Sequence, residues 1–389
     1  MTLRLGPASL LLPLVLAACG GTATDGTAPA STAADTSAAS QPAAPAADNR
    51  LNVYNWSDYI AESTIPDFER DTGIKVTYDV YSENEVLDAK LKVGNSGYDV
   101  VFPTARPFAQ RQLAAGLYAP LDKAKLGNWD KLDPAILASL ATIDPGNAHL
   151  VPYMWHTTGI GYNPAKLKAA LGADFVLDSW AQLFNPKVAE KLKSCGIAML
   201  DDDQEGFAAA LFALGKDPNS TNPADLEAAA NLFAGIRPYV RYFNNSQYIN
   251  DLANGDVCIA HGYSGDVVQA RDRAAEAGNG IEVAYVVPSE GSLRQLDVIA
   301  IPADAAHKDN AHRFINYLLE PKVSAAITDF VNYASPNLEA KALVEPAIAS
   351  DPAVFPSAAT MAKLVDPATL PDEAQRERVR TWTRIKSGR

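Results

Sequence analysis

In the N-terminal part of the chain, segments with the two-residue hydrophobic period of a β-strand alternate with segments that have the 3.6-residue period of an α-helix. Leu51–Asn55 and Ile74–Val80 have the pattern of short β-strands. The stretches 62–70 and 82–93 are helical in pattern, and a glycine follows each of them. Tyr98–Phe102 then forms a third strand. This strand-helix-strand-helix-strand order predicts a parallel, doubly wound α/β sheet with helices on both faces.

Two loops follow the carboxyl ends of the first and third expected strands. Residues 56–59 read Trp-Ser-Asp-Tyr, and residues 103–106 read Pro-Thr-Ala-Arg. Ligands of doubly wound sheets bind in loops at the carboxyl ends of the strands, so we expect the binding site here. Ser82 and Glu85 have the spacing of a capping box, which predicts how the second helix begins.

The same two periods continue through the rest of the chain. Further strands are expected at His156–Tyr162, Val257–His261, Ile281–Val287 and Asp297–Ile301. Further helices are expected at Ser179–Leu183, Pro186–Leu192, Gly206–Leu214, Ser246–Ala253 and Ala311–Leu319. Periodicity alone does not assign these segments to one lobe or another.

The N-terminus has the pattern of an export signal. It carries one arginine and then an apolar run too short to span a bilayer, which predicts a signal peptide over residues 1–18. Leu16–Cys19 is similar to a bacterial lipobox, which implies lipidation of Cys19; the alternative is an ordinary secretory signal with an incidental cysteine. Residues 19–49 then form an expected flexible linker of small and polar residues. We therefore expect a periplasmic protein that contacts a membrane only through a lipid anchor.

Composition narrows the class of protein. The chain has 389 residues, of which 48% are hydrophobic and 20% charged, enough for two compact lobes with sizeable cores. Wholesale disorder and a polytopic membrane protein are excluded. The net charge of -13 argues against binding to nucleic acid, which usually requires a basic face.

The cysteines and histidines suggest no metal site. With Cys19 lipidated, Cys195 and Cys258 remain as one pair in an oxidising compartment. We expect them to form a disulfide, and two buried free thiols are the alternative. The five histidines follow no paired metal-ligand spacing, so we expect no metal.

Enzyme motifs are incomplete. Gly262–Asp266 resembles a nucleophile elbow, but its second glycine comes one position early. Gly159 and Gly161 lack the third glycine of a dinucleotide-binding loop, and no phosphate-binding Gly-Lys-Ser/Thr sequence occurs. We expect no cofactor and no enzymatic activity, although the many carboxylates leave a secreted hydrolase as an alternative.

Six longer segments remain, namely Asn55–Ile60, Val151–Asn163, Lys193–Gly196, Ser246–Cys258, Asp297–Pro302 and Arg378–Thr383. Together they resemble one family, the polyamine-binding proteins of bacterial ABC importers. The resemblance covers essentially all of residues 50–389 and is greatest to the putrescine-binding branch. It implies a two-lobed periplasmic binding protein of type II, with doubly wound sheets and two hinge crossovers. We expect one lobe to comprise 51–153 plus 281–340, and the other 154–280 plus 341–389.

The resemblance also implies a ligand, a partner and a set of contacts. The protein would capture a polyamine, putrescine or a close relative, and deliver it to a membrane ABC permease, and we expect it to act as a monomer. A diamine has two ammonium groups on an apolar stem, so its site needs carboxylates for the charges and aromatic faces for the methylenes. The matching positions are Trp56, Ser57, Asp58, Tyr59, Thr104, Glu205, Tyr263, Asp266, Asp297 and Tyr333. The neighbouring acids Asp201–Asp203 leave the match of Glu205 uncertain by one residue.

Structural roles are the alternative for most of these residues. Asp58 has the position of a helix N-cap, and Trp56 and Tyr263 are residue types that often pack in cores. Asp266 and Asp297 are typical of solvated turns. It is their joint placement on the family's positions that favours ligand binding.

Three departures from the family bear on selectivity. Tyr263 stands where the putrescine binders carry a second tryptophan, and Gln295 replaces a phenylalanine. Arg106 occupies a position that is usually uncharged, and a guanidinium cannot be deprotonated. It would therefore turn to solvent, pair with an acid, or meet an anionic group on the ligand; the first two are favoured. The third leaves a zwitterionic or carboxylated amine as an alternative ligand, and a receptor for a membrane sensor is an alternative role.

Overall fold

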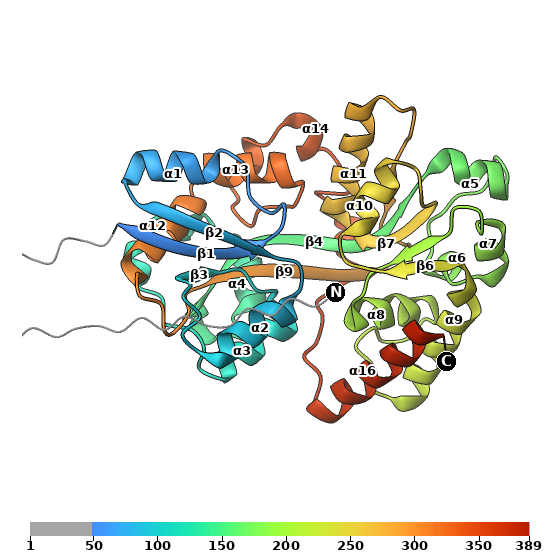
Figure 1. The fold of residues 1–389 in the computed structure, drawn as a ribbon, viewed down its shortest axis with the longest axis horizontal. Coiled ribbons are helices and arrows are strands. Elements are labelled where there is room, and N and C mark those ends of the chain that lie inside the picture. Colours follow the sequence, from blue (N-terminus) through green and yellow to red (C-terminus); the bar gives the residue numbers. More distant parts are fainter. Residues whose placement is uncertain (1–48, 389) are drawn as a thin grey trace, which may run out of the picture. The chain divides into compact units, whose positions relative to one another are not determined.

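A single mixed β-sheet runs through residues 49–388, the part of the chain described by the computed structural model. Its strands follow the hydrogen-bonded order β2-β1-β3-β9-β4-β7-β5-β6, with β10 paired to β9 and β8 to β4 (Figure 1). The strands are β1 Arg50–Trp56, β2 Lys75–Tyr81, β3 Val100–Val101, β4 Leu150–Tyr162, β5 Ile197–Met199, β6 Val240–Phe243, β7 Ile259–Tyr263, β8 Ala284–Val286, β9 Ser292–Ala300 and β10 Leu364–Val365. The predicted signal peptide (1–18), the lipidation site Cys19 and the linker up to residue 48 lie outside the described residues.

The first three strands confirm the predicted parallel unit. β1 pairs in parallel with both β2 and β3, in a register that places Arg50 opposite Lys75 and Val53 opposite Val100. The connecting helices are α1 (Thr64–Thr72) and α2 (Asn84–Val93). β9 joins β3 and β4 in antiparallel orientation, so the complete sheet is mixed.

Helices cover both faces of this half of the sheet. Leu51 and Val53 point into one hydrophobic core, and Tyr54 points into another, as the two-residue period of a strand requires. The helices that face the first core are α1, α12 (Lys308–Leu318) and α13 (Pro321–Val331). Those on the other face are α2, α3 (Gln110–Ala114) and α4 (Pro134–Leu140) (Figure 1). This arrangement is the doubly wound α/β architecture that the hydrophobic pattern predicts.

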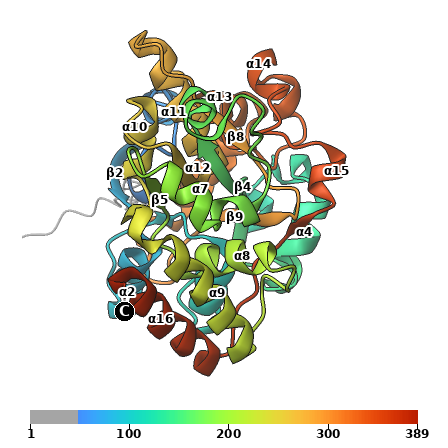
Figure 2. The ribbon, with the colours of Figure 1, turned by 90° about the vertical axis from the view of Figure 1, so that its right-hand side faces the viewer.

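The other half of the sheet is built in the same way. Ile197 and Met199 of β5 point into one core, whereas Ala198 between them points into another. The helices on the first side are α5 Pro164–Leu171, α6 Trp180–Leu183, α7 Pro186–Lys191, α8 Asp203–Ala213, α9 Pro223–Ile236 and α16 Asp372–Ser387. The opposite side carries α10 Gln247–Ala253 and α11 Ser264–Ala277, whereas the short helices α14 Pro346–Ala349 and α15 Ala358–Met361 lie in the C-terminal segment (Figures 1 and 2).

Two strands belong to both halves. Val151 of β4 contributes to a core of the first half, and Ile160 of the same strand contributes to a core of the second. In β9, Leu293 lies in the second half and Ile299 in the first. β4 and β9 therefore connect the two pairs of cores.

The predicted capping box at α2 is wrong. The helix begins at Asn84, its N-cap position is Glu83, and no side chain accepts the cap hydrogen bond. The side chain of Asn84 instead bonds Thr104, with Oδ1 accepting from the Thr104 amide at 3.2 Å and Nδ2 donating to Oγ1 at 3.1 Å. A tertiary contact with a neighbouring loop thus replaces local capping.

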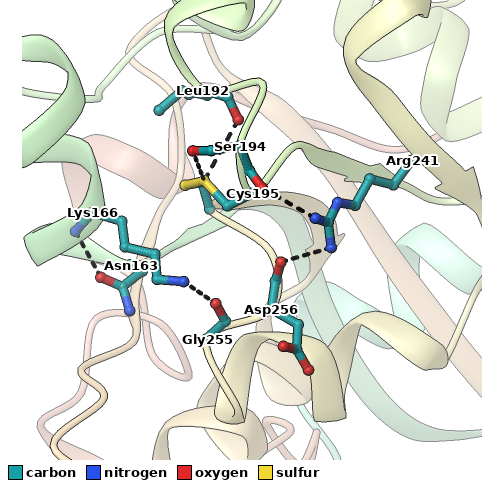
Figure 3. The surroundings of a disulfide bond; sticks show 9 residues. Asn163, Lys166, Leu192, Ser194, Cys195, Arg241, Gly255 and Asp256 are labelled. Carbon is teal, nitrogen blue, oxygen red and sulfur yellow. Dashed lines mark hydrogen bonds between the residues drawn. A yellow bond between two sulfur atoms is a disulfide. The ribbon is translucent and has the colours of Figure 1, made fainter.

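Cys195 and Cys258 are joined as a disulfide whose Cα atoms are 5.4 Å apart (Figure 3). Arg241 on β6 ties together the two loops that carry them. Its guanidinium donates to the carbonyl oxygens of Asp256 at 2.9 Å and Ser194 at 3.2 Å (Figure 3). Within residues 49–388, no helix has both the length and the apolar character needed to cross a bilayer.

Candidate functional site

A cavity of about 600 Å³ is lined by residues from both halves of the sheet. It lies at the loops that follow β1 and β3, where the sequence predicts a binding site. Nearly all the predicted ligand-binding residues line it, namely Trp56, Ser57, Asp58, Tyr59, Thr104, Tyr263, Asp266, Asp297 and Tyr333. The exception is Glu205, which lies behind the cavity wall. The fold thus brings together side chains that are widely separated in sequence.

Asp297 on β9 is a buried carboxylate that lines this cavity. Its side chain is held by two hydroxyl groups: Thr104 Oγ1 donates to Oδ1 and the Tyr59 hydroxyl donates to Oδ2, both at 2.8 Å. Because burial disfavours the charged form, the pKa of Asp297 is raised to about 6. The alternative of a solvated turn residue is therefore wrong for Asp297, which is 4% exposed.

Asp266, in the first turn of α11, has a matching environment. The hydroxyls of Tyr333 and Tyr248 each donate to one of its oxygens, both at 2.7 Å. Burial again raises the pKa, to about 6. Neither Asp266 nor Asp297 forms an ion pair with any residue in the described part of the chain. Asp297 is buried and Asp266 half-buried, and two such carboxylates without a cationic partner favour a cation in the cavity between them.

The loop after β1 brings an exposed acid and an aromatic ring to the same cavity. Asp58 is exposed and has a left-handed backbone conformation, with φ of 53°. It is not a helix N-cap, because Ser63 holds that position at α1. The indole Nε1 of Trp56 donates to the Phe102 carbonyl at 2.7 Å, which fixes the ring at the cavity wall.

His156 is a site residue that was not predicted from the sequence. This residue lines the cavity, is 7% exposed, and packs edge-on against two rings, with centroid distances of 5.1 Å to Tyr263 and 4.9 Å to Tyr333. Burial lowers its pKa to about 3, so the ring is neutral. Tyr248, whose hydroxyl donates to Asp266, was not predicted as a site residue either. Strand and helix periods show that such residues are buried, but not that they meet at one cavity.

Glu205 reaches the site only through another side chain. It lies in the first turn of α8 and is 1% exposed. Gln295, which lines the cavity, donates from Nε2 to Glu205 Oε1. Burial, and next the charge of Asp202, raise the pKa of Glu205. Gln295 therefore separates this acid from the cavity.

Arg106 is held by neutral oxygen atoms. Its Nη2 donates to the Ser139 carbonyl at 2.9 Å and also to the Thr142 hydroxyl, both near the end of α4. The side chain is half-buried, and it neither turns freely to solvent nor pairs with a carboxylate of the site. Burial lowers the pKa of the guanidinium, whereas the charge of Asp366 raises it. Its part in selectivity stays a prediction.

The glycines of the segment 262–266 have a packing role. A Cβ atom on Gly265 would lie 2.2 Å from Cε2 of Tyr333, and one on Gly262 would lie 2.6 Å from Cε2 of Tyr248. Only glycine lets these two tyrosines approach Asp266. Ser264 between them is 2% exposed, unlike the exposed serine of a nucleophile elbow.

We expect Gly265→Ala to destabilise the protein by about 1–3 kcal/mol, the usual cost of overpacking a tightly packed site. The new methyl group would push the Tyr333 ring away from Asp266. Urea unfolding measures the change. Gly127→Ala is the matched control, because the nearest atom to its Cβ would lie 4.0 Å away. Equal stability of the two variants would contradict this packing role.

Comparisons with known proteins agree with the fold and the site. The family model for bacterial extracellular solute-binding proteins matches residues 63–356. A putrescine-binding periplasmic protein of Pseudomonas aeruginosa is 51% identical over 347 residues, which is 89% of this chain and 94% of the relative. A putrescine-binding periplasmic protein of Escherichia coli is 51% identical over 340 residues, 87% of this chain and 92% of the relative.

Solved structures of solute-binding proteins are similar to this chain in fold as well. A spermidine/putrescine ABC transporter substrate-binding protein from Streptococcus pneumoniae has a TM-score of 0.73 and 27% identity, covering 87% of this chain and 99% of that one. The TpPotD lipoprotein of Treponema pallidum has a TM-score of 0.75 and 28% identity, with coverage of 87% and 99%. The predicted two-lobed type II fold is therefore confirmed at the level of fold class.

Proposed function

Because the chain belongs to the bacterial extracellular solute-binding proteins, we propose that it captures a polyamine, putrescine or a close relative, and delivers it to an ABC permease. Its relatives are solute-binding transport proteins and not enzymes, so the hydrolase alternative is set aside. The observation that carries the proposal is a pair of carboxylates in one cavity without a cationic partner, the half-buried Asp266 and the buried Asp297.

The chemistry of a diamine fits this pair. Each ammonium group needs a carboxylate when it leaves water, because an unpaired buried charge is costly. Asp266 and Asp297 would each bind one end of the ligand, and the exposed Asp58 would add charge at the cavity rim. The four-carbon stem between the ammonium groups would pack on rings, where cation–π attraction also contributes about 0.5–2 kcal/mol. The rings lining the cavity that would provide these contacts are Trp56, Tyr59, Tyr263 and Tyr333.

The remaining predicted residues would act less directly. Thr104 positions the Asp297 carboxylate by a hydrogen bond, Ser57 adds a hydroxyl at the cavity, and Glu205 acts through Gln295. Arg106 already donates hydrogen bonds to neutral oxygen atoms, so its guanidinium does not require an anionic group on the ligand. A zwitterionic or carboxylated amine is therefore the weaker alternative.

The proposal includes a hinge between two lobes. We propose the lobes 51–153 plus 281–340 and 154–280 plus 341–389. The passage of β4 between the two pairs of cores supports the crossover at 153/154, and that of β9 favours a second crossover within β9, which begins at Ser292. The cavity is lined from both sides, so closure of the lobes about these strands would enclose the ligand.

The export features form part of the same proposal. A signal peptide over 1–18, lipidation at Cys19 and a linker over 19–49 would place the protein in the periplasm on a lipid anchor. An oxidising compartment would also maintain the disulfide of Cys195 and Cys258. We propose that the protein acts there as a monomer.

Isothermal titration calorimetry of the purified protein tests the proposed ligand. We expect a saturable heat of binding with putrescine. The absence of heat with putrescine, agmatine, cadaverine and spermidine would overturn the polyamine proposal. A parallel thermal-shift screen with amino acids tests the carboxylated-amine alternative, because a bound ligand raises the melting temperature.

We expect putrescine binding to weaken at acidic pH. Asp266 and Asp297 have pKa values raised to about 6, and the ligand requires their ionised forms. At about pH 5.5 each carboxyl would be about one-quarter ionised, so affinity would fall about fifteenfold from its neutral-pH value. The ligand itself stays charged, because alkyl ammonium groups titrate near a pKa of about 10. Calorimetry across this range measures the effect, and equal affinities at both ends would contradict it.

The stability of the ligand-free protein depends on pH in the opposite direction from putrescine affinity, because these two carboxyls stabilise the folded state more at acidic pH. The folded state holds protons on these two carboxyls above their usual pKa of 3.8. Their contribution to the free energy of unfolding therefore declines as the pH rises from about 4 to about 6. The double variant Asp266→Asn/Asp297→Asn serves as the control and should lack this part of the decline.

A further inference from the structure

Two neighbouring side chains in the cavity wall have polar atoms without hydrogen-bond partners. The unpartnered atoms are the two ring nitrogens of His156 and the Oε1 atom of Gln295. His156 is 7% and Gln295 5% exposed, so protein rather than bulk water surrounds most of each side chain. An unsatisfied buried polar atom costs about 1–3 kcal/mol, and such groups in native structures often mark a functional site.

The strand register places these two side chains side by side. His156 on β4 is the direct antiparallel partner of Gln295 on β9. Direct partners project to the same face, with Cβ atoms about 4.5–5.5 Å apart. Both side chains thus lie in one part of the cavity wall, with their unpartnered atoms buried just beneath its surface and the Glu205 carboxyl group behind them.

His261 shows that an unpartnered histidine is not enough. Both of its ring nitrogens also lack partners, but it is fully buried and packs edge-on against Trp180, with ring centroids 5.5 Å apart. It does not line the cavity. Among the buried unpartnered polar atoms of residues 49–388, only those of His156 and Gln295 belong to side chains that line the cavity.

The chemistry of this surface selects a donor-rich cation. Gln295 has committed its amide nitrogen to Glu205, so its free Oε1 can only accept a hydrogen bond. The neutral imidazole of His156 offers one further acceptor. A methylene stem satisfies neither atom, and a single primary ammonium already paired with Asp266 or Asp297 has few donors left.

We propose that His156 and Gln295 bind N–H donors that putrescine lacks, so that the site prefers amines that carry such donors over a plain four-carbon diamine. The donors belong either to a guanidinium that replaces one ammonium group or to an additional ammonium group. This inference rests on the proposed function and names the ligand class within it. His156 and Gln295 are then specificity-determining residues.

Calorimetry on the full protein with putrescine, agmatine and spermidine tests the preference. Agmatine carries a guanidinium and spermidine a third amine, so the two ligands distinguish the possible groups. We expect at least one of them to bind about tenfold more tightly than putrescine, the effect of roughly one well-placed hydrogen bond to a charged group. Tighter binding of putrescine than of both would overturn the inference and leave the proposed function intact. No binding of any of the three would overturn the proposed function itself.

Two variants test the residues. His156→Phe and Gln295→Met remove the free polar atoms and keep much of the side-chain volume. We expect each to lower the ratio of the larger amine's affinity to that of putrescine by about tenfold. His149→Phe is the control, because His149 does not line the cavity and is bonded to Asp144.

Thermal unfolding without ligand separates binding from a structural role. Replacing an unsatisfied polar group by an apolar one of similar size is close to neutral or stabilising. The ligand-free melting temperature of His156→Phe should therefore equal or exceed that of the unmodified protein. Gln295→Met also removes the hydrogen bond to the buried Glu205 carboxyl, so its melting temperature should be lower. An unchanged affinity ratio, or equal losses for all three ligands, would overturn the assignment of these residues.

Discussion

The Asp266→Asn variant is expected to bind putrescine about a hundredfold more weakly than the unmodified protein, or worse. Removing one partner of a buried ion pair costs about 3–5 kcal/mol, because the other charge is left without compensation. Here the uncompensated charge would be one ammonium of the ligand. Calorimetry measures the loss directly, and Asp297→Asn should behave alike because its carboxylate has a matching environment.

The controls for this prediction separate binding from folding. Asp174→Asn removes an acid that is exposed and does not line the cavity, so it should leave the affinity unchanged. Burial raises the pKa of Asp266 because the ionised form is unfavourable there without a ligand. Loss of that charge should therefore leave the ligand-free melting temperature close to its original value. A stable Asp266→Asn variant with full affinity for putrescine would contradict the proposed site.

The second large effect is expected on stability. Replacing both Cys195 and Cys258 by serine opens a covalent loop with a sequence separation of 63. In the chain-entropy model a loop of this length stabilises the folded state by about 4 kcal/mol relative to the open chain. Urea unfolding of the double variant should show a lower midpoint than the oxidised protein.

Reduction provides a control that needs no mutation. The unmodified protein in a strong reductant should unfold at a midpoint near that of the double variant, provided that the reductant reaches the bond. Neither cysteine lines the cavity, so putrescine affinity below the unfolding transition should be the same for both proteins. Equal stability of oxidised and double-variant protein would mean that the two thiols are free.

Local sequence patterns were sufficient for much of the fold. The first strand shows why: the neighbours Val53 and Tyr54 point into different cores because strand side chains alternate between faces. The start of α2 shows the limit. Ser82 and Glu85 have correct capping-box spacing, yet the bond between Asn84 and Thr104 determines how the chain enters this helix.

The residues of the candidate site could be predicted from the sequence where they match ligand-binding positions of the family that the chain resembles. All the predicted ligand-binding residues but Glu205 line the cavity. His156 could not be found in this way, because its exposure to the cavity depends on the pairing of β4 with β9. The position of the Arg106 guanidinium likewise depends on Ser139 and Thr142, which come from a different part of the chain.

The sequence by itself determined the alternation of strands and helices, the class of fold and the residue types of a cation site. These follow from short-range periods and from long matching segments. Only the tertiary structure decided which carboxylates lose contact with water. Asp297 is bonded to Tyr59, 238 positions away, and Asp266 to Tyr333, 67 positions away. Burial and hydrogen bonding of a side chain are properties of such distant partners, and they set the charge that the cavity offers to a ligand.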